Sequence, residues 1–464
     1  MDEAARALSR FGLGGLGDQD PPANPRAWLE AQFKAYQPRP AALAAAPPTA
    51  AMIALLVAAR NERRERKEES AQTGIQMKGA EDNVPSPFRP LRDAYVEAAG
   101  MRTNAALSSP APFIERLVHF WSNHFAISID KAATLGFAGP FEFEAIRPNV
   151  LGTFGDLLSA AEHHPAMLLY LDQAESIGPD STLGARTARR GKQRGLNENL
   201  AREILELHTL GVRTGYSQDD VTEFARALTG WIVGGLAKQP ALRGPGPQFW
   251  FADLIHQPGA RSIMGKRYDQ SGEAQAQAVL DDLAVHPATA RHIATKLARH
   301  FAADVPPPAL VSRLEQTFLA TRGDLPALYR ELIAAPEVWV GAAKFRNPWD
   351  WTLAALRVCQ IKAVSAKSAA TTLQQLGQAI WKPGSPAGYD DTAASWAGPD
   401  ALVRRVEVAQ RLAQRSGAGI DARTLAQRLF GSELSTATTA AIQRAESGEQ
   451  ALALLLSSPE MMRR

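Results

Sequence analysis

The sequence predicts a mostly α-helical fold, a large multi-helix body with a small β-ribbon near residues 247–268. Alanine, leucine and arginine dominate the 464 residues, and strand-like alternation is scarce. Apolar residues recur at helical spacing through most of the chain, which is the main indication of helices. Hydrophobic residues make up 45% and charged residues 21% of the chain, which is the balance of a globular protein.

The bulk properties exclude several classes of protein. The net charge of +3 gives no general case for a nucleic-acid partner. The single cysteine, Cys359, excludes an intramolecular disulfide and a multi-cysteine metal site, and we expect it to be a small buried hydrophobe. The opening MDEAARALSRFGLGG has acids at once and no apolar core of a signal peptide. No run of about 18 apolar residues predicts a membrane span, so we expect a cytoplasmic protein.

Composition and helical pattern divide the chain into four regions. Residues 58–71, AARNERRERKEESA, predict a solvated helix rather than a nucleic-acid site, because the acids cancel the bases. Residues 72–92 contain Gly, Pro, Asn and Ser and predict a loop. We expect an N-terminal helical layer with this charged helix and loop (1–95), a central helical core with a long loop at 173–196 (96–245), a β-ribbon with helices (246–361), and a C-terminal helical region (362–464).

A first candidate residue lies in PFIERLVHFWSNHFAIS, residues 112–128. At helical spacing His124 falls inside the apolar face of this helix. The opposite side carries Glu115, His119 and Asn123 at i, i+4 and i+8, so we expect His119 to be solvated. A neutral histidine on an apolar face needs a partner for each ring nitrogen. His124 is therefore either a satisfied core histidine or a metal ligand, an acid/base or a relay.

The helix NENLAREILELHTLGV, residues 197–212, has the caps of an ordinary helix. Asn197 is suited to cap its N-terminus and Gly211 to end it. Glu198, Arg202 and Glu206 are spaced at i, i+4 and i+8, and each such pair stabilises an exposed helix by only about 0.2–0.5 kcal/mol. This ladder alone indicates no function.

Two other residues of this helix are candidates for a site. His208 falls in the middle of the apolar face. Glu203 lies at the edge of that face, so we expect it to be partly buried. Asp172, which ends the apolar run HHPAMLLYLD, is a third candidate, either to reach a histidine or to cap its helix. The two residues Glu203 and His208 lie on different sides of one face and are poorly placed to bind one ion together.

The remaining segments have simpler interpretations. The loop at 173–196 is either a solvated loop or a lid that meets an anionic substrate or partner through Arg186, Arg189, Arg190, Lys192 and Arg194. Ser217 and Asp220 predict a capping box at the start of the helix 217–229. Two short segments on either side of a Pro-Gly turn predict the β-ribbon at 247–268.

Several long blocks occur in a fixed order along the chain: FWSNHF, HPAMLLYLD, NENLAREILELHTLGV, DVTEFARALTGW, HPATARHIATKLARHF and SSPEMMRR. In this order they resemble a large bacterial family known as domain of unknown function 1800. The resemblance covers nearly the whole chain and implies no established activity. It implies an association with a sulfatase-like family, domain of unknown function 1501, whose genes often lie nearby. The matching positions are Trp121, Asn123, His124, Asp172, Asn197, Glu198, Asn199, Arg202, Glu203, Glu206, Thr229, Gly230, Trp231, His256, Gly259, Gly265 and Lys266.

The first functional hypothesis is an enzyme with a polar pocket among the helices 112–128, 163–172, 197–210 and 217–229. His124 would act as acid/base or metal ligand, Glu203 and Asp172 would orient it or complete a coordination shell, and Arg202 would bind an anionic group. Such carboxylate–histidine groupings are where function tends to concentrate. A hydrolytic or metal-assisted reaction is the least specific expectation. A divalent metal, if present, would be held by His124, His208 and Glu203.

The second hypothesis is a non-catalytic helical scaffold or accessory protein. Its polar blocks would hold the helices in register, and its partner would be a protein such as the sulfatase-like neighbour. Exposed aromatic residues in WKPGSPAGYDDTAASW and GPQFWF would then form the interface. Binding of a small molecule or glycan without chemistry is a third alternative.

Overall fold

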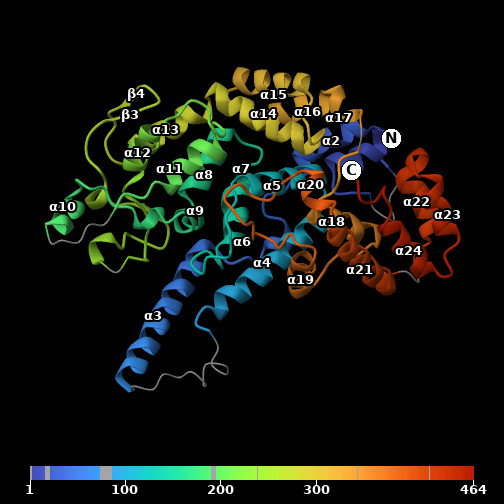
Figure 1. Cartoon of the computed structure of the whole chain (residues 1–464), viewed down its shortest axis with the longest axis horizontal. Coiled ribbons are helices and arrows are strands. Elements are labelled where there is room, and N and C mark those ends of the chain that lie inside the picture. The colour runs from blue at the N-terminus through green and yellow to red at the C-terminus, as the bar shows by residue number, and fades with distance from the viewer. Residues whose placement is uncertain are drawn as a thin grey trace.

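The computed structural model describes residues 3–15, 21–73, 86–189, 195–237, 239–341, 343–416 and 419–464. The chain is mostly helical with two small antiparallel sheets, which confirms the predicted fold class (Figure 1). One continuous buried cluster extends from Ala7 near the start of the chain to Met462 near its end. Within the described part of the chain, no helix has the length and apolar character needed to cross a membrane.

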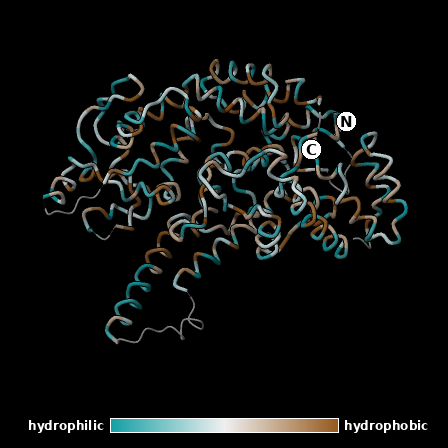
Figure 2. Tube along the Cα trace, viewed as in Figure 1, coloured by the Kyte–Doolittle hydropathy of each residue, from teal (hydrophilic) through white to brown (hydrophobic). Residues whose placement is uncertain are grey.

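The N-terminal helices include one that projects from the body. This helix, α3, carries the predicted charged segment, and its outer part is hydrophilic and exposed (Figure 2). Arg64 pairs with Glu68 and Arg66 with Glu62 along it, and its exposed outer part agrees with the expected solvated helix. Residues 74–85 of the expected loop lie outside the described residues. The helices are α1 (Glu3–Arg6), α2 (Pro25–Ala35), α3 (Thr49–Thr73) and α4 (Arg89–Ser108).

The central helices surround α5, which is buried on nearly every side. The expectation that one side of α5 faces solvent is wrong. Glu115 is 1% exposed and pairs with Arg147, and His119 is also buried. A helix enclosed by neighbours has no solvated face, and its polar residues find buried partners instead. The central helices are α5 (Pro112–His124), α6 (Ala138–Pro140), α7 (Arg147–Asn149), α8 (Phe154–His163), α9 (Pro165–Tyr170), α10 (Thr182–Ala188), α11 (Asn199–Glu203) and α12 (Gln218–Leu228).

The segment after α11 departs from a regular helix. Residues Ile204–His208 form a π-helical turn that continues α11. The predicted capping box of α12 is present, since Ser217 and Asp220 exchange hydrogen bonds. The expected long loop at 173–196 contains the short helix α10, and its basic residues 190, 192 and 194 lie outside the described residues.

Three of the four strands in the described residues lie within the ribbon predicted near 247–268, but the pairing differs and the first strand lies before it. β1 (Trp231–Val233) pairs with β2 (Phe249–Phe251), and β3 (Arg261–Ile263) pairs with β4 (Lys266–Tyr268). The segments flanking the Pro-Gly turn therefore do not pair with each other. The hairpin turn is Met264-Gly265, where both residues have positive φ angles, as a type I′ hairpin turn requires.

The C-terminal helices complete the body and bring the two ends of the chain close together (Figure 1). Arg10 donates to the carbonyl of Val338, and Phe11 packs against Trp339. These helices are α13 (Glu273–Ala284), α14 (Pro287–Phe301), α15 (Pro308–Ala320), α16 (Leu325–Ala334), α17 (Pro336–Trp339), α18 (Pro348–Val358), α19 (Ala366–Gln375), α20 (Ala393–Trp396), α21 (Pro399–Ser416), α22 (Ala422–Phe430), α23 (Thr436–Gln443) and α24 (Gly448–Leu456).

Candidate active site

A pocket of about 410 Å³ is lined by α5, α14, the first turn of α18 and the segment 378–391. Most of its ionisable side chains come from the two helices α5 and α14. The lining includes Arg102, Arg116, His119, Ser122, Asn123, His124, His292, Lys296, Arg299, His300, Trp349, Asp350, Trp381, Tyr389, Asp390 and Asp391. A pocket of this size with several converging polar groups is the usual form of a small-molecule site.

The sequence of α14 explains why it turns its ionisable residues toward the pocket. Pro287 occupies the first helical position, and the ring of His286 accepts a hydrogen bond from the Ala288 amide as a cap. The helix buries its apolar residues Ala290, Ile293, Ala294, Leu297, Ala298 and Phe301. The pocket-lining residues His292, Lys296, Arg299 and His300 follow at i, i+4, i+7 and i+8, which places them along one side of the helix.

His300 and Asp391 form a hydrogen-bonded pair in this pocket. His300 Nδ1 lies 2.7 Å from Asp391 Oδ2. An ionised carboxylate can only accept, so Nδ1 carries the proton and Nε2 of the neutral ring is an acceptor. That Nε2 is buried and has no hydrogen-bond partner in the described part of the chain. Burial lowers the pKa of His300 to about 4, against the opposing charge of Asp391.

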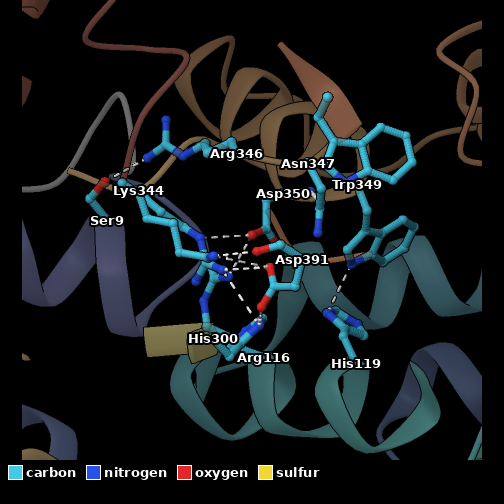
Figure 3. A network of polar contacts seen from close by, with 12 residues as sticks. Ser9, Arg116, His119, His300, Lys344, Arg346, Asn347, Trp349, Asp350 and Asp391 are labelled. Atoms are coloured by element: carbon cyan, nitrogen blue, oxygen red, sulfur yellow. Dashed lines mark hydrogen bonds and ion pairs between the residues drawn. The ribbon is translucent and has the colours of Figure 1, made fainter. Parts of the chain in front are cut away.

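Asp391 is fixed by a network of buried charges (Figure 3). Arg116 donates to Asp350 at 2.7 Å, and Arg464 lies 3.1 Å from Asp350 and 3.5 Å from Asp391. Burial raises the pKa of Asp391, but His300, together with nearby cations, lowers it overall. The pKa of Asp350 is likewise held well below its ordinary value, because the charges of Arg116 and Arg464 outweigh its burial. Both carboxylates are therefore ionised at neutral pH.

Besides His300, two pocket histidines, His119 and His124, each have a ring nitrogen without a partner among the described residues. Trp349 Nε1 donates to His119 Nδ1 at 2.9 Å. An indole nitrogen only donates, so His119 carries its own proton on Nε2, which has no acceptor among the described residues. His124 Nε2 lies 3.1 Å from the carbonyl oxygen of His208, to which it donates, and this leaves Nδ1 as a buried acceptor without a described partner. Burial lowers the pKa of both rings, so both are neutral at pH 7.

Lys296 and Arg299 are the cations of the pocket that lack a partner. Neither makes an ion pair or hydrogen bond to any other residue that the structure describes, and Arg299 Nε is buried. Burial lowers the pKa of Lys296 to about 8; the charge of Asp391 opposes this effect, and that of Arg299 adds to it. By contrast, Arg102 is paired with Glu142 at 2.8 Å.

One wall of the pocket is the segment 378–391, which is fastened to α5. The Asn123 amide accepts from Tyr389 N and donates to Tyr389 O, both at 2.8 Å. Trp381 is buried and donates to Glu142 at 3.0 Å. Trp396 is buried as well. The expectation that both tryptophans of this stretch are exposed at an interface is therefore wrong, because their indole groups pack into the body.

Of the residues proposed from the sequence, His124 lies at this pocket. His208 is fully buried beside it, with Nδ1 2.7 Å from Glu162 Oε1. Glu203 is half-buried as expected, and burial raises its pKa, but it does not line the pocket. The described residues contain no group of three or more His, Cys, Asp or Glu side chains that could hold a metal ion.

The other two proposed residues lie away from the pocket in ordinary ion pairs. Asp172 adopts a left-handed conformation, with φ of 58°, and pairs with Lys131. Arg202 pairs with Glu198 at 3.2 Å, as the predicted ladder requires. Neither residue lines the pocket, so the structure does not bring them together with His124.

Sequence reasoning missed His300, Asp391, Lys296 and Arg299. The signal for three of them is present in HIATKLARH, where four ionisable residues recur on one side of an otherwise apolar helix. The contact to Asp391 has no such signal, because the pair is 91 residues apart in the chain.

Comparison with known protein families gives a match that covers nearly the whole chain. A family model described as "Protein of unknown function (DUF1800)" matches residues 6–463, nearly the whole chain. No curated protein and no solved structure matches the chain.

Proposed function

The chain belongs to the DUF1800 family, and from its pocket we propose that it is an enzyme that works by general acid–base catalysis. The observation that supports this most directly is the His300–Asp391 pair, whose Nδ1–Oδ2 distance is 2.7 Å. A carboxylate that holds Nδ1–H leaves Nε2 as the base, which is the arrangement by which Asp and His activate a nucleophile in hydrolases.

A hydrolytic reaction is the simplest chemistry for this arrangement. A water molecule in the pocket would transfer a proton to His300 Nε2 as its oxygen attacks an electrophilic carbon, phosphorus or sulfur. Asp391 would stabilise the imidazolium, which would then return the proton to the leaving group. His119 Nε2–H would donate to the oxygen on which negative charge develops.

His124 stays in the proposal as a second acceptor in the same pocket. Its Nδ1 is free of protein partners in the described part of the chain, so it suits a substrate N–H or O–H group. Glu203, Asp172 and Arg202 are left out, because they do not line the pocket. The proposed steps need no metal.

The alternative is a non-catalytic scaffold that binds a partner such as a sulfatase-like protein. It draws its support from buried ion pairs that join distant segments, such as Arg147–Glu115 at 2.6 Å and Arg102–Glu142 at 2.8 Å. Buried pairs of this kind hold elements in register without any chemistry.

The test uses chromogenic esters of carboxylic acids, of phosphate and of sulfate with the purified full chain. His300→Gln and Asp391→Asn are compared with His163→Gln, which changes a half-buried histidine of α8 outside the pocket lining. Loss of an acid/base residue lowers kcat by about 10²–10⁴-fold, and we expect this for His300→Gln alone among the histidine variants. Turnover that is indifferent to both pocket variants would refute the proposal. Absence of turnover across the panel would favour the scaffold.

A further inference from the structure

We propose that the pocket binds an oxyanion group, a phosphate, sulfate or carboxylate, between Lys296 and Arg299 of α14. As a statement about the substrate this rests on the proposed function. As a statement about binding it stands without any catalysis, because the two cations that would hold the anion are Lys296 and Arg299 and no proton transfer is required.

The first argument is that neither of these cations forms an ion pair with a carboxylate among the described residues. The other pocket arginines are neutralised: Arg116 donates to Asp350 at 2.7 Å and Arg102 to Glu142 at 2.8 Å. Lys296 and Arg299 are three residues apart on one helix and have no carboxylate within ion-pair distance among the described residues. Like charges at this spacing destabilise a helix, and the effect grows where water is partly excluded. A bound anion removes this repulsion.

The nearest acids are already occupied. Asp391 Oδ2 accepts from His300, and its Oδ1 lies within ion-pair distance of Lys344 and Arg464. Asp390 accepts from the hydroxyl of Thr392 at 2.8 Å, from the hydroxyl of Ser395, and from the backbone amide of Asp391 at 2.7 Å. These two carboxylates therefore already have other partners, and Lys296 and Arg299 of α14 remain available to bind an anionic ligand.

A neutral donor in the same pocket adds to the case. His119 is buried, and its Nε2–H has no acceptor among the residues described. A buried donor without an acceptor is costly, by about 1–3 kcal/mol, and an oxyanion supplies the acceptor. Cations together with a neutral N–H donor are the usual contacts of a bound phosphate or sulfate.

The dimensions of the pocket limit the ligand. A volume of about 410 Å³ suits a small organic molecule rather than a polymer chain, since small-molecule pockets span about 300–1,000 Å³. The walls include the rings of Phe120, Trp349 and Trp381 beside the charged groups. This combination fits an anionic group on a compact, partly apolar body.

The experiment measures binding of inorganic phosphate, sulfate and acetate to the full chain by calorimetry, with chloride as reference. Lys296→Gln and Arg299→Gln each remove one pocket cation. Arg291→Gln is the matched control, because it removes one charge from the same helix outside the pocket, where Arg291 pairs with Glu315 at 2.9 Å. We expect each pocket variant to weaken binding by about ten-fold or more, as loss of a charge-assisted hydrogen bond does, and the control to leave it unchanged.

The three anions identify the group that the pocket prefers: phosphate or sulfate above acetate indicates a tetrahedral group, and the reverse order a carboxylate. Affinity no higher than for chloride, or equal losses in pocket and control variants, would overturn the inference. If Lys296→Gln weakens anion binding while His300→Gln leaves turnover unchanged, the inference stands and the proposed function fails. Thermal unfolding checks the fold, and removal of an unpaired cation should not lower the Tm.

Discussion

Replacing Gly388 by alanine should detach one wall of the pocket. Gly388 has a φ of +81°, and a Cβ atom at this position would lie 2.3 Å from the Asn123 carbonyl oxygen and 2.8 Å from its side-chain oxygen. The next residue, Tyr389, makes both hydrogen bonds to the Asn123 amide. The added methyl group would therefore clash with Asn123, the residue of α5 that holds the segment 378–391 by hydrogen bonds.

The structure allows the cost to be bounded. A left-handed conformation costs an alanine about 1–2 kcal/mol relative to glycine. The contact is with backbone, which cannot swing away, so the segment must shift and lose its two hydrogen bonds to Asn123. Each of these contributes about 0.5–1.5 kcal/mol, so we expect the wall to be destabilised by about 2–5 kcal/mol.

Hydrogen exchange of the backbone amides of residues 378–391 measures this directly. Gly384→Ala is the control, because a Cβ atom there meets nothing within 4 Å. Exchange in this segment should become at least about thirty-fold faster in Gly388→Ala, the factor that corresponds to 2 kcal/mol, and stay near the wild-type rate in the control. Equal protection in the two variants would show that the wall is not held at Asn123.

Three further predictions concern stability and titration. Glu115→Gln should lower the free energy of unfolding by about 3–5 kcal/mol in urea titrations, because it leaves Arg147 buried and unpaired, whereas Glu68→Gln on exposed α3 should change it by less than about 0.5 kcal/mol; similar losses would contradict this. Folding lowers the pKa of Lys296 from its ordinary value of 10.5 to about 8. Between pH 8 and pH 10.5 the unfolded chain therefore binds more protons at this residue than the folded chain does. This group therefore adds stability as pH rises through that range, a rise that Lys296→Met should remove from thermal unfolding curves. Burial raises the pKa of Cys359 to about 12, so a thiol reagent should modify it in urea but not in the native protein; rapid native labelling would count against its burial.

The parts of the structure that depend on local sequence were predictable. The capping box at Ser217 and Asp220, the buried position of His208 and the half-buried position of Glu203 all follow from residue spacing within one helix. His119 was mispredicted for a physical reason. Its helix is enclosed by other segments, and no pattern within α5 reports the indole of Trp349, 230 residues away, that binds it.

The site depends on contacts between distant segments, which spacing cannot reveal. His124 was found because it interrupts an apolar face. His300 lies beside Phe301 on a helix whose polar side has several charges. What marks His300 as a candidate base is its hydrogen bond to Asp391, which lies in a distant loop. Of the two helices singled out from the sequence, α5 lines the pocket, while the π-helical turn Ile204–His208 after α11 contributes only the backbone carbonyl of His208 that accepts from His124.

The spread of the pocket along the chain bears on how such a site can be inherited. Its lining begins at Arg102 and ends at Asp391, and Arg464 lies within ion-pair distance of both Asp350 and Asp391. No contiguous fragment shorter than this carries the complete arrangement. Recombination within the chain would separate the histidines from the groups that orient them. The shortest segment that could carry the whole site is therefore almost the entire polypeptide. This agrees with the family match, which extends from residue 6 to residue 463.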